Sequence, residues 1–357
     1  MKLVNQLIRP EILRCQPYNA SSVDYPVKLD AMESPYPLPG ELREKWVDSL
    51  KNVPINRYPD SRASFLKSRL REFMSIPDSL SLILGNGSDE LIQIICMAFY
   101  GQDRPFMAPA PTFVVYQLIA DWLATDLKYV QLDADDFSLD PEAILQAINK
   151  YNPIVIFIAN PNNPTGNLFD EKLILEIINQ AKGLVVIDEA YYTYSGCSLV
   201  DHICEHENLV AIRTLSKCGM AGLRLGCLIG PVQWIEQFEK IRLPYNINSL
   251  SQLSADFLLS HRSVIEGWIK AVCQERERLL IDLSEIDGVK VWPSKTNFIL
   301  FRTLNRCADE IHQGLINKGI IIKNLHGSSP LLTNCLRVSI GSENENQCFL
   351  EALNQLL

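Results

Sequence analysis

One lysine and one arginine, seven residues apart, stand among small residues in the segment TLSKCGMAGLRLG, residues 214–226. The apolar run 209–212 directly precedes this segment, so we expect a buried strand to lead into it. A lysine amine can bond covalently to a carbonyl group, and an arginine guanidinium is a permanent cation that suits phosphate or carboxylate. Small residues between Lys217 and Arg224 would let the backbone approach an anion. The segment could also be an ordinary surface loop.

The glycine-rich cluster GNGSD, residues 85–89, follows the apolar run 79–84 and precedes a segment with helical spacing. Glycines let the backbone come close to an anion, and the first turn of a helix offers free N–H groups. The cluster therefore has two interpretations. It is either an anion site or a tight turn in which Ser88 or Asp89 caps the helix.

Two further polar clusters also follow apolar runs. NPNNPTG (160–166) comes after the run 153–159, and its two X-Pro bonds favour an extended turn that places Asn163 at a strand end. DEAYY (188–192) follows another apolar run. A carboxylate such as Asp188 is costly at the end of a buried strand unless it meets a cation. The alternatives are an ordinary turn for the first cluster and a helix N-cap for the second.

Apolar runs alternate with amphipathic helical segments from residue 64 to residue 230, which predicts a mostly parallel sheet covered on both faces. Ligands of such sheets lie beyond the carboxyl ends of the strands, where the polar clusters fall. After residue 248, long helices precede short strands and a final helix, which indicates a second, smaller α+β domain. The first 60 residues are rich in proline and indicate an arm with one helix near 40–51. We predict an α/β protein with an N-terminal arm and part of the small domain at 1–45, a large domain at 46–248 and a small domain at 249–357.

Composition excludes several classes of function. With a net charge of −9 and no basic cluster, the chain is not expected to bind nucleic acid. No apolar run approaches the ~20 residues of a membrane span, and the N-terminus does not resemble a signal peptide. Ten scattered cysteines without a CxxC pair indicate reduced thiols, so we expect a cytoplasmic protein.

His202, Cys204 and His206 raise the question of a metal site, because histidines four residues apart share one face of a helix. The sequence has no HExxH motif and no distant cluster of ligands. A solvated helix or loop is the simpler interpretation, and we predict no metal.

The motifs GNGSDE, PTF, NPNNPTG, DEAY, TLSK…GLRLG and CLRVSIG occur in an order that resembles the fold-type-I pyridoxal-phosphate enzymes of the class I/II aminotransferase superfamily. The resemblance covers nearly the whole chain. Within the superfamily, RPEILRCQPY, KLDAMESPYPLP, NRYPD, KTNFILF and GIIIKN are most similar to the histidinol-phosphate aminotransferases. The resemblance implies a large domain with a mostly parallel seven-stranded sheet sandwiched by helices, a smaller α+β domain, pyridoxal 5′-phosphate as cofactor, and a homodimer with composite sites.

The resemblance also implies roles around the cofactor ring. Lys217 would form the Schiff base with the cofactor aldehyde and then move a proton between substrate and cofactor. Asp188 would pair with the pyridinium nitrogen and keep it protonated. Asn163 and Tyr191 would hydrogen-bond the ring oxygen, and Phe113 would stack on the ring.

Further roles concern the two ends of the ligands. The residues implied around the cofactor phosphate are Gly87, Ser88, Asp89, Thr214, Ser216 and Arg224, with Tyr58 from the partner subunit. The residues implied for substrate are Tyr18, Asn163, Lys323 and Arg337. The guanidinium of Arg337 would suit both the carboxylate of glutamate or 2-oxoglutarate and a substrate phosphate.

This sequence departs from the family pattern at three places. The interval from Lys217 to Arg224 is one residue shorter than in many relatives. Met32 stands where asparagine is common, so no role is carried over to it. Lys323 stands where arginine is usual, which keeps the charge but loses the planar fork. His326, beside the same turn, is a further candidate for substrate contact.

The implied reaction is the transfer of the amino group of L-histidinol phosphate to 2-oxoglutarate, in histidine biosynthesis. An aromatic amino-acid aminotransferase and an enzyme like threonine-phosphate decarboxylase are alternatives that keep the cofactor. A regulatory domain that binds the cofactor without turnover, and a nicotinamide-binding protein, are alternatives from other classes.

Overall fold

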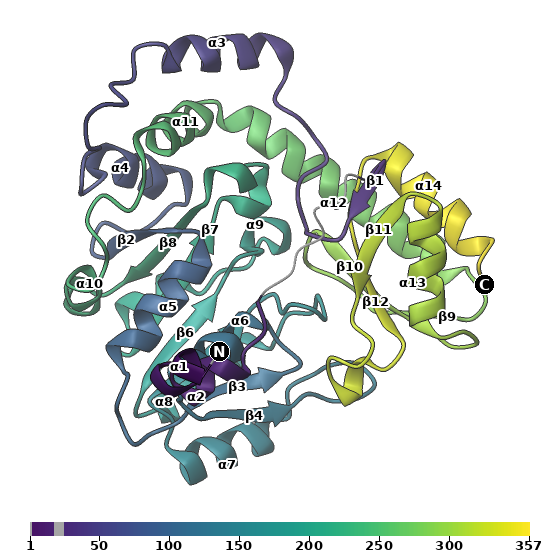
Figure 1. Cartoon of the computed structure of the whole chain (residues 1–357), viewed down its shortest axis with the longest axis horizontal. Helices are drawn as coiled ribbons and strands as arrows, with labels where there is room; N and C mark the ends of the chain where they lie inside the picture. The colour runs from purple at the N-terminus through teal and green to yellow at the C-terminus, as the bar shows by residue number, and fades with distance from the viewer. Residues whose placement is uncertain (1, 18–24) are drawn as a thin grey trace.

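The computed structural model describes residues 2–17 and 25–357, which form two β-sheets and the helices that cover them (Figure 1). The strands are β1 (Val27–Leu29), β2 (Ser81–Asn86), β3 (Phe106–Ala110), β4 (Leu127–Gln131), β5 (Val155–Ala159), β6 (Leu184–Asp188), β7 (Leu209–Thr214), β8 (Leu225–Gly230), β9 (Val289–Val291), β10 (Phe298–Thr303), β11 (Ile320–Asn324) and β12 (Cys335–Ser339).

The α-helices are α1 (Lys2–Leu7), α2 (Pro10–Arg14), α3 (Gly40–Leu50), α4 (Ser64–Phe73), α5 (Ser88–Ala98), α6 (Val115–Trp122), α7 (Pro141–Tyr151), α8 (Glu171–Gln180), α9 (Tyr192–Ser195), α10 (Val232–Glu239), α11 (Ser249–Ser260), α12 (Arg262–Ser284), α13 (Ala308–Asn317) and α14 (Glu343–Asn354). The short 3₁₀ helices are η1 (Val200–Cys204), η2 (Ser216–Cys218), η3 (Ala221–Leu223) and η4 (Pro330–Leu332). No helix within the described ranges combines the length and the apolar character that crossing a membrane requires.

The larger sheet has seven strands in the order β2-β8-β7-β6-β5-β3-β4. Neighbouring pairs from β7 to β4 are parallel, whereas β8 runs antiparallel to β2 and β7. Strands β5 and β6 are buried along their whole length, as parallel strands with two covered faces must be. Val186 packs with residues of α5, α6 and α10, and Val185 packs with residues of α4, α7 and α8. The predicted α/β fold with a sandwiched, mostly parallel sheet is confirmed.

The smaller sheet has the order β1-β11-β12-β10-β9. Strand β1, from the N-terminal arm, pairs in parallel with β11, and the other neighbours are antiparallel. Helices α12, α13 and α14 share an apolar cluster with one face of this sheet. The arm thus contributes a strand to a sheet built mainly from the last 70 residues, while the predicted boundaries at residues 45 and 248 stay a prediction.

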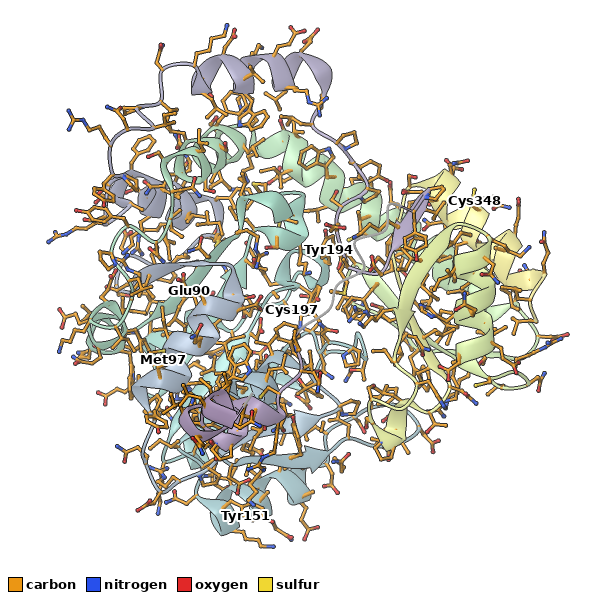
Figure 2. The ribbon with its side chains drawn as sticks, viewed as in Figure 1. Glu90, Met97, Tyr151, Tyr194, Cys197 and Cys348 are labelled. Carbon is orange, nitrogen blue, oxygen red and sulfur yellow. The ribbon has the colours of Figure 1, made fainter. Side chains whose placement is uncertain are left out.

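Tyr194 lies where the two sheets approach each other (Figure 2). Its ring belongs to the apolar cluster of the smaller sheet, and its hydroxyl donates a hydrogen bond to the backbone carbonyl of Lys217. Arg276 of α12 donates to the carbonyl of Tyr194 at 3.3 Å. These contacts hold the turn that carries Lys217 against the smaller sheet and α12.

A buried ion pair fixes the strand ends next to that turn. Arg213 of β7 donates from Nε to Oε2 of Glu189 at 2.9 Å, and the two side chains are 3% and 1% exposed. Arg213 also donates to the carbonyl of Met74 at 2.7 Å and to Ser198 Oγ at 2.7 Å. The pair joins β7, the end of β6 and the end of α4.

Replacing Arg213 by methionine should therefore destabilise the protein, because Glu189 would keep a buried charge without a cation. We expect the apparent free energy of unfolding in urea to fall by about 3–5 kcal/mol. The matched control is Lys51→Met, which removes a pair with Asp48 whose side chains are 66% and 68% exposed. That variant should lose less than about 1 kcal/mol. Equal losses in both variants would contradict this account of the buried pair.

Candidate functional site

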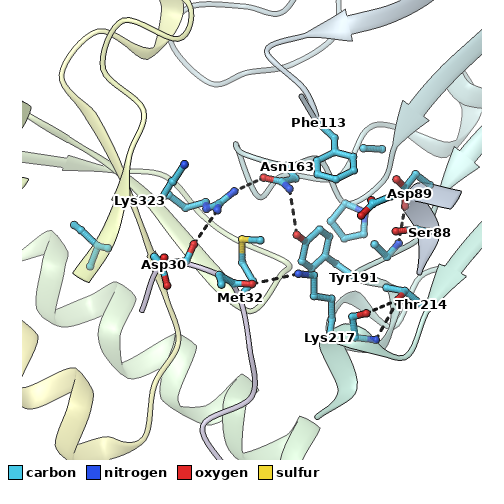
Figure 3. A pocket seen from close by; sticks show the side chains of 18 of the residues that line it. Asp30, Met32, Ser88, Asp89, Phe113, Asn163, Tyr191, Thr214, Lys217 and Lys323 are labelled. Carbon is cyan, nitrogen blue, oxygen red and sulfur yellow. Dashed lines mark hydrogen bonds between the residues drawn. The ribbon is translucent and has the colours of Figure 1, made fainter. Parts of the chain in front are cut away.

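A cavity of about 410 Å³ lies between the carboxyl ends of the larger sheet's central strands and the smaller sheet (Figure 3). Residues at the ends of β5, β6 and β7 and at the start of α5 line one side of it. Residues of β1, β11 and β12 line the other side. The cavity therefore occupies the place at which open parallel sheets bind ligands.

Lys217 enters the cavity from η2, directly after β7. Its ammonium donates to the backbone carbonyl of Ala31 at 3.3 Å. Burial lowers the pKa of Lys217 to about 8, and the nearby cation of Arg337 acts in the same direction. A larger fraction of this amine is therefore neutral near pH 7–8 than for an exposed lysine, which favours nucleophilic and proton-transfer chemistry.

Asp188 ends β6 and is buried at the floor of the cavity. Oδ2 accepts a hydrogen bond from the hydroxyl of Tyr116 at 2.9 Å, and Oδ1 accepts one from the backbone N–H of Ala190 at 3.1 Å. Burial raises the pKa of Asp188 to about 6, although both hydrogen bonds oppose this shift. Within residues 2–17 and 25–357, no basic side chain forms an ion pair with this carboxylate. A cationic group bound in the cavity would relieve that deficit.

Asn163, Tyr191 and Arg337 line the cavity and form a hydrogen-bonded chain. Figure 3 shows Asn163 and Tyr191 in this chain. Arg337 Nη1 donates to Asn163 Oδ1 at 2.5 Å, and Asn163 Nδ2 donates to the hydroxyl oxygen of Tyr191 at 3.2 Å. Burial raises the pKa of Tyr191 well above its usual value, so its hydroxyl stays protonated. Because that oxygen accepts from Asn163, its own proton is available to an acceptor in the cavity.

The start of α5 faces the segment after η3. Gly87, Ser216 and Arg224 together form a concave group, called here the anion cradle. Gly87 has φ +84°, and a Cβ at this position would lie 2.6 Å from Nη2 of Arg224. Arg224 Nη1 donates to Ser216 Oγ at 3.4 Å, and its Nη2 lies 3.6 Å from Asp89 Oδ2. Ser216 Oγ also accepts from the hydroxyl of Thr214 at 3.0 Å. The shorter interval after Lys217 thus leaves Arg224 facing the helix N-terminus.

The alternative in which Ser88 or Asp89 caps α5 is wrong. Gly87 occupies the cap position, and both other residues already lie in the first turn of the helix. The positive φ of Gly87 turns the chain one residue earlier than a serine or aspartate cap would require. Ser88 and Asp89 line the cavity instead.

The four predicted residues that remain lie in different places. Phe113 lines the cavity with its ring perpendicular to that of Tyr116, at 5.7 Å between centroids. Lys323 lies at the exposed rim, opposite Arg337 in the pairing of β11 with β12. Tyr58 is 81% exposed and is not among the described residues that line the cavity of its own chain. Tyr18 lies outside the described residues.

The structure places Met32 and His326, to which the sequence assigns no firm role. Met32 lines the cavity with φ 55°, and its backbone N–H donates to Ser339 Oγ at 2.8 Å. His326 is not among the described lining residues, and its Nδ1 accepts from the backbone N–H of Asn334 at 2.9 Å. The structure thus gives His326 a contact within the fold.

In the described part of the chain, His202, Cys204 and His206 do not form a group that could hold a metal ion. Its Nε2 lies 3.1 Å from Glu171 Oε1. One group with suitable ligand atoms within 4.8 Å of one another is Cys307, Asp309 and His326. Because Nδ1 of His326 accepts an N–H, its neutral ring carries the proton on Nε2, and a metal would have to break that arrangement.

Several residues that line the cavity or contact its lining were not predicted from the sequence. Tyr116 lies in a helix whose spacing marks it only as a core residue, yet its hydroxyl binds Asp188. The carbonyls of Asp30 and Ala31 accept hydrogen bonds from Arg337 and Lys217, and a backbone contact leaves no side-chain pattern in the sequence. Lys28 lines the cavity from β1, a strand too short to show a pattern of alternation.

Comparison with known proteins gives a consistent result. Residues 26–353 match the family model "Aminotransferase class I and II". The chain is 47% identical over 350 residues to histidinol-phosphate aminotransferase 2 of Nitrosococcus oceani, which covers 98% of this chain and 97% of that protein. It is 41% identical over 350 residues to histidinol-phosphate aminotransferase of Aquifex aeolicus, with 98% of each chain covered.

The fold is shared with solved structures of low sequence identity. The crystal structure of histidinol-phosphate aminotransferase from Sinorhizobium meliloti in complex with pyridoxal-5′-phosphate has a TM-score of 0.87 at 20% identity, over 98% of this chain and 97% of that one. The enzyme from Clostridium acetobutylicum has a TM-score of 0.84 at 24% identity, over 92% and 98%. From the matched model and the full-length relatives, the chain belongs to the class I and II aminotransferase family, in the group of histidinol-phosphate aminotransferases.

Proposed function

We propose that the protein transfers the amino group of L-histidinol phosphate to 2-oxoglutarate, with pyridoxal 5′-phosphate as cofactor, in L-histidine biosynthesis. The products are imidazole-acetol phosphate and L-glutamate. The observation that carries this proposal is the content of one cavity. It holds a lysine amine with a lowered pKa, a buried carboxylate that forms no ion pair with any described residue, and an arginine from the smaller sheet.

The residues present fit the cofactor. A protonated ring nitrogen would supply the cation that Asp188 lacks among the described residues. The cradle of Gly87, Ser216 and Arg224 offers a helix N-terminus and a guanidinium to a phosphate. Asn163 and Tyr191 would hold the ring oxygen, and Phe113 would cover the ring.

When bound, pyridoxal phosphate supplies an aldehyde that bonds to amines and a ring that accepts electrons from a bond broken at the substrate α-carbon. The chain's own residues do the rest. Lys217 is proposed to take the α-proton at Nζ and to return it, for which a pKa of about 8 is well matched. Asp188, once paired, holds a proton on the ring nitrogen. The hydroxyl of Tyr191 donates its proton into the cavity.

Arg337 is proposed to hold the anionic end of each substrate. It is buried, and its contacts to Asn163 and to the carbonyl of Asp30 orient the guanidinium. Lys323, directly opposite on β11, adds a second cation. Because both half-reactions would use this one cavity, the kinetics should be ping-pong.

We also propose that the protein is a homodimer in the cytoplasm, with sites composed from both subunits. Exposed Tyr58 stacks on exposed Tyr245 at 4.5 Å between centroids, and their near neighbours in the chain, Ile55 and Leu243, are exposed too. Such a patch is typical of a contact between proteins. All ten cysteines are free thiols, which supports a reducing compartment.

The proposed substrate is tested by comparing amino donors. With 2-oxoglutarate as acceptor, we expect kcat/KM for histidinol phosphate to exceed that for phenylalanine by at least about 100-fold, because phenylalanine leaves cations of the site without the phosphate. Lys217→Ala should lose turnover of both donors, and borohydride should no longer fix the cofactor to the chain. A preference for phenylalanine would overturn the substrate, and release of CO₂ from phosphothreonine would favour the decarboxylase.

A second prediction concerns the carboxylate of Asp188. A cationic ring binds the ionised form better, so affinity for the cofactor should rise with pH up to about 6 and then level off for this group. Below that pH we expect the affinity for the cofactor to fall roughly tenfold for each pH unit. Pyridoxamine phosphate is the appropriate probe, because it has no aldehyde to react with Lys217. Its affinity is measured by fluorescence titration from pH 5 to pH 8.

Two variants check the assignment of this pH step. Asp188→Asn should abolish it, whereas Tyr116→Phe should move its midpoint upward, because the lost hydrogen bond lowers the pKa of Asp188. A step that survives in Asp188→Asn belongs to another group.

The composite site predicts complementation between inactive subunits. Lys217→Ala and Tyr58→Ala proteins should each be impaired, the first in turnover and the second in retention of the cofactor. Random exchange of their subunits should restore about one quarter of wild-type activity, because half the dimers are mixed and each holds one intact site. Activity is measured at a limiting cofactor concentration, together with the mass of the assembly. No recovery in mixed dimers would mean that Tyr58 serves its own chain or no site.

A further inference from the structure

Three cations occupy one face of the smaller sheet, the face that lines the cavity. Pairing of β1 with β11 places Lys28 beside Ile321, and pairing of β11 with β12 places Lys323 beside Arg337. Side chains two residues apart on a strand share a face, so Ile321 and Lys323 point the same way. Lys28, Lys323 and Arg337 therefore point to the same side, and all three line the cavity.

The ammonium of Lys28 is held by two carboxylates. It lies 2.5 Å from Glu33 Oε2 and 3.2 Å from Asp30 Oδ1. Partial burial alone would lower the pKa of Lys28, but the hydrogen bonds to Glu33 and Asp30 outweigh it and raise the pKa. Lys28 thus stays charged. Its side chain is 37% exposed and that of Glu33 is 52% exposed, so the contact between them costs little to exchange.

Two positive charges stand opposite each other on the neighbouring strands β11 and β12. Lys323 and Arg337 are direct partners in an antiparallel pair, an arrangement that is destabilising unless an anion lies between them. Figure 3 shows Asp30 and Lys323 on the side of the cavity away from Asp89 and Thr214, which belong to the cofactor end. A substrate anion is the group that would reach this row of cations.

The two substrates of the proposed reaction differ in charge at this end. A carboxylate carries one negative charge, whereas a phosphate monoester carries about −1.5 to −2 near neutral pH and has three acceptor oxygens. A lysine at position 323 contributes one point charge without the fork of an arginine. A further cation would therefore stabilise the bound phosphate more than a bound carboxylate.

We propose that Lys28 is a specificity-determining residue that leaves Glu33 to bind the phosphate of the amino donor beside Lys323, and so favours phosphate esters over carboxylate substrates. This proposal rests on the function proposed above. Glu33 is the resting partner of Lys28 and is not among the described residues that line the cavity.

The test compares KM values of the holoenzyme and its Lys28→Met variant. The KM for histidinol phosphate should rise roughly tenfold, kcat should change little, and the KM for glutamate should rise much less. The matched control is Lys128→Met. Lys128 lies on β4 with 36% exposure and pairs with Asp126 at 2.6 Å, and it is not a described lining residue of the cavity. This variant should behave as wild type.

A Glu33→Gln variant separates binding from a merely structural role. If Lys28 binds phosphate, freeing it from Glu33 should leave the KM for histidinol phosphate equal to that of wild type or lower. If the Lys28–Glu33 pair only braces β1, both variants should raise the KM values of both substrates alike. That second pattern would overturn the proposal.

The affinity for inorganic phosphate tests the role of Lys28 independently of whether histidinol phosphate is the substrate. In the holoenzyme the cofactor's own phosphate fills its cradle, so calorimetry with inorganic phosphate reports on the substrate end. Lys28→Met should weaken this binding severalfold, even if the wild-type enzyme proves to prefer another phosphorylated amine. Unchanged phosphate affinity in Lys28→Met, with Lys323→Met weakened, would refute the role of Lys28.

Discussion

The hydrogen bond from Arg337 to Asn163 is the contact on which the site depends, because it joins the two sheets across the cavity. Arg337 comes from a central strand of the smaller sheet, and Asn163 follows a central strand of the larger one. Asn163 in turn donates to Tyr191, which follows the neighbouring strand β6. The position of Arg337, which is proposed to bind substrate, is thus coupled through two hydrogen bonds to the hydroxyl proposed to hold the cofactor ring.

Burial acts on the two reactive groups of the cavity in opposite directions, and both directions suit one ligand. The same loss of water lowers the pKa of Lys217 to about 8 and raises the pKa of Asp188 to about 6. The amine is thereby readied for bonding to an aldehyde, and the carboxylate for pairing with a cationic ring. A cofactor with both features would relieve the cost of burying both groups, as proposed above for pyridoxal phosphate.

The sequence predicted the parts of the site that follow apolar strands. A polar side chain directly after such a run lies at the carboxyl end of a buried strand, where parallel sheets bind ligands. Asp188, Asn163 and Lys217 belong to this class, and so do the strands that carry them. The short strand β1 was not foreseen, since its partner lies some 290 residues further along the chain. The carbonyl of Ala31 was not foreseen either, because any residue type supplies one. The role proposed for Tyr58 would depend on a second subunit, whose position a single chain cannot specify.

Strand β1 offers a reason why lysine, and not the usual arginine, stands at position 323. An arginine at this position would offer two parallel N–H groups to a phosphate, and a lysine offers one mobile charge. Strand β1 brings a second lysine to the same face of the sheet, two positions along from the level of Lys323. Two lysine ammonium groups on adjacent strands can approach one dianion from different directions, which a single arginine guanidinium cannot do. The loss of the fork at Lys323 and the presence of Lys28 are then two parts of one arrangement, with the carboxylates of Asp30 and Glu33 holding the second charge until substrate arrives.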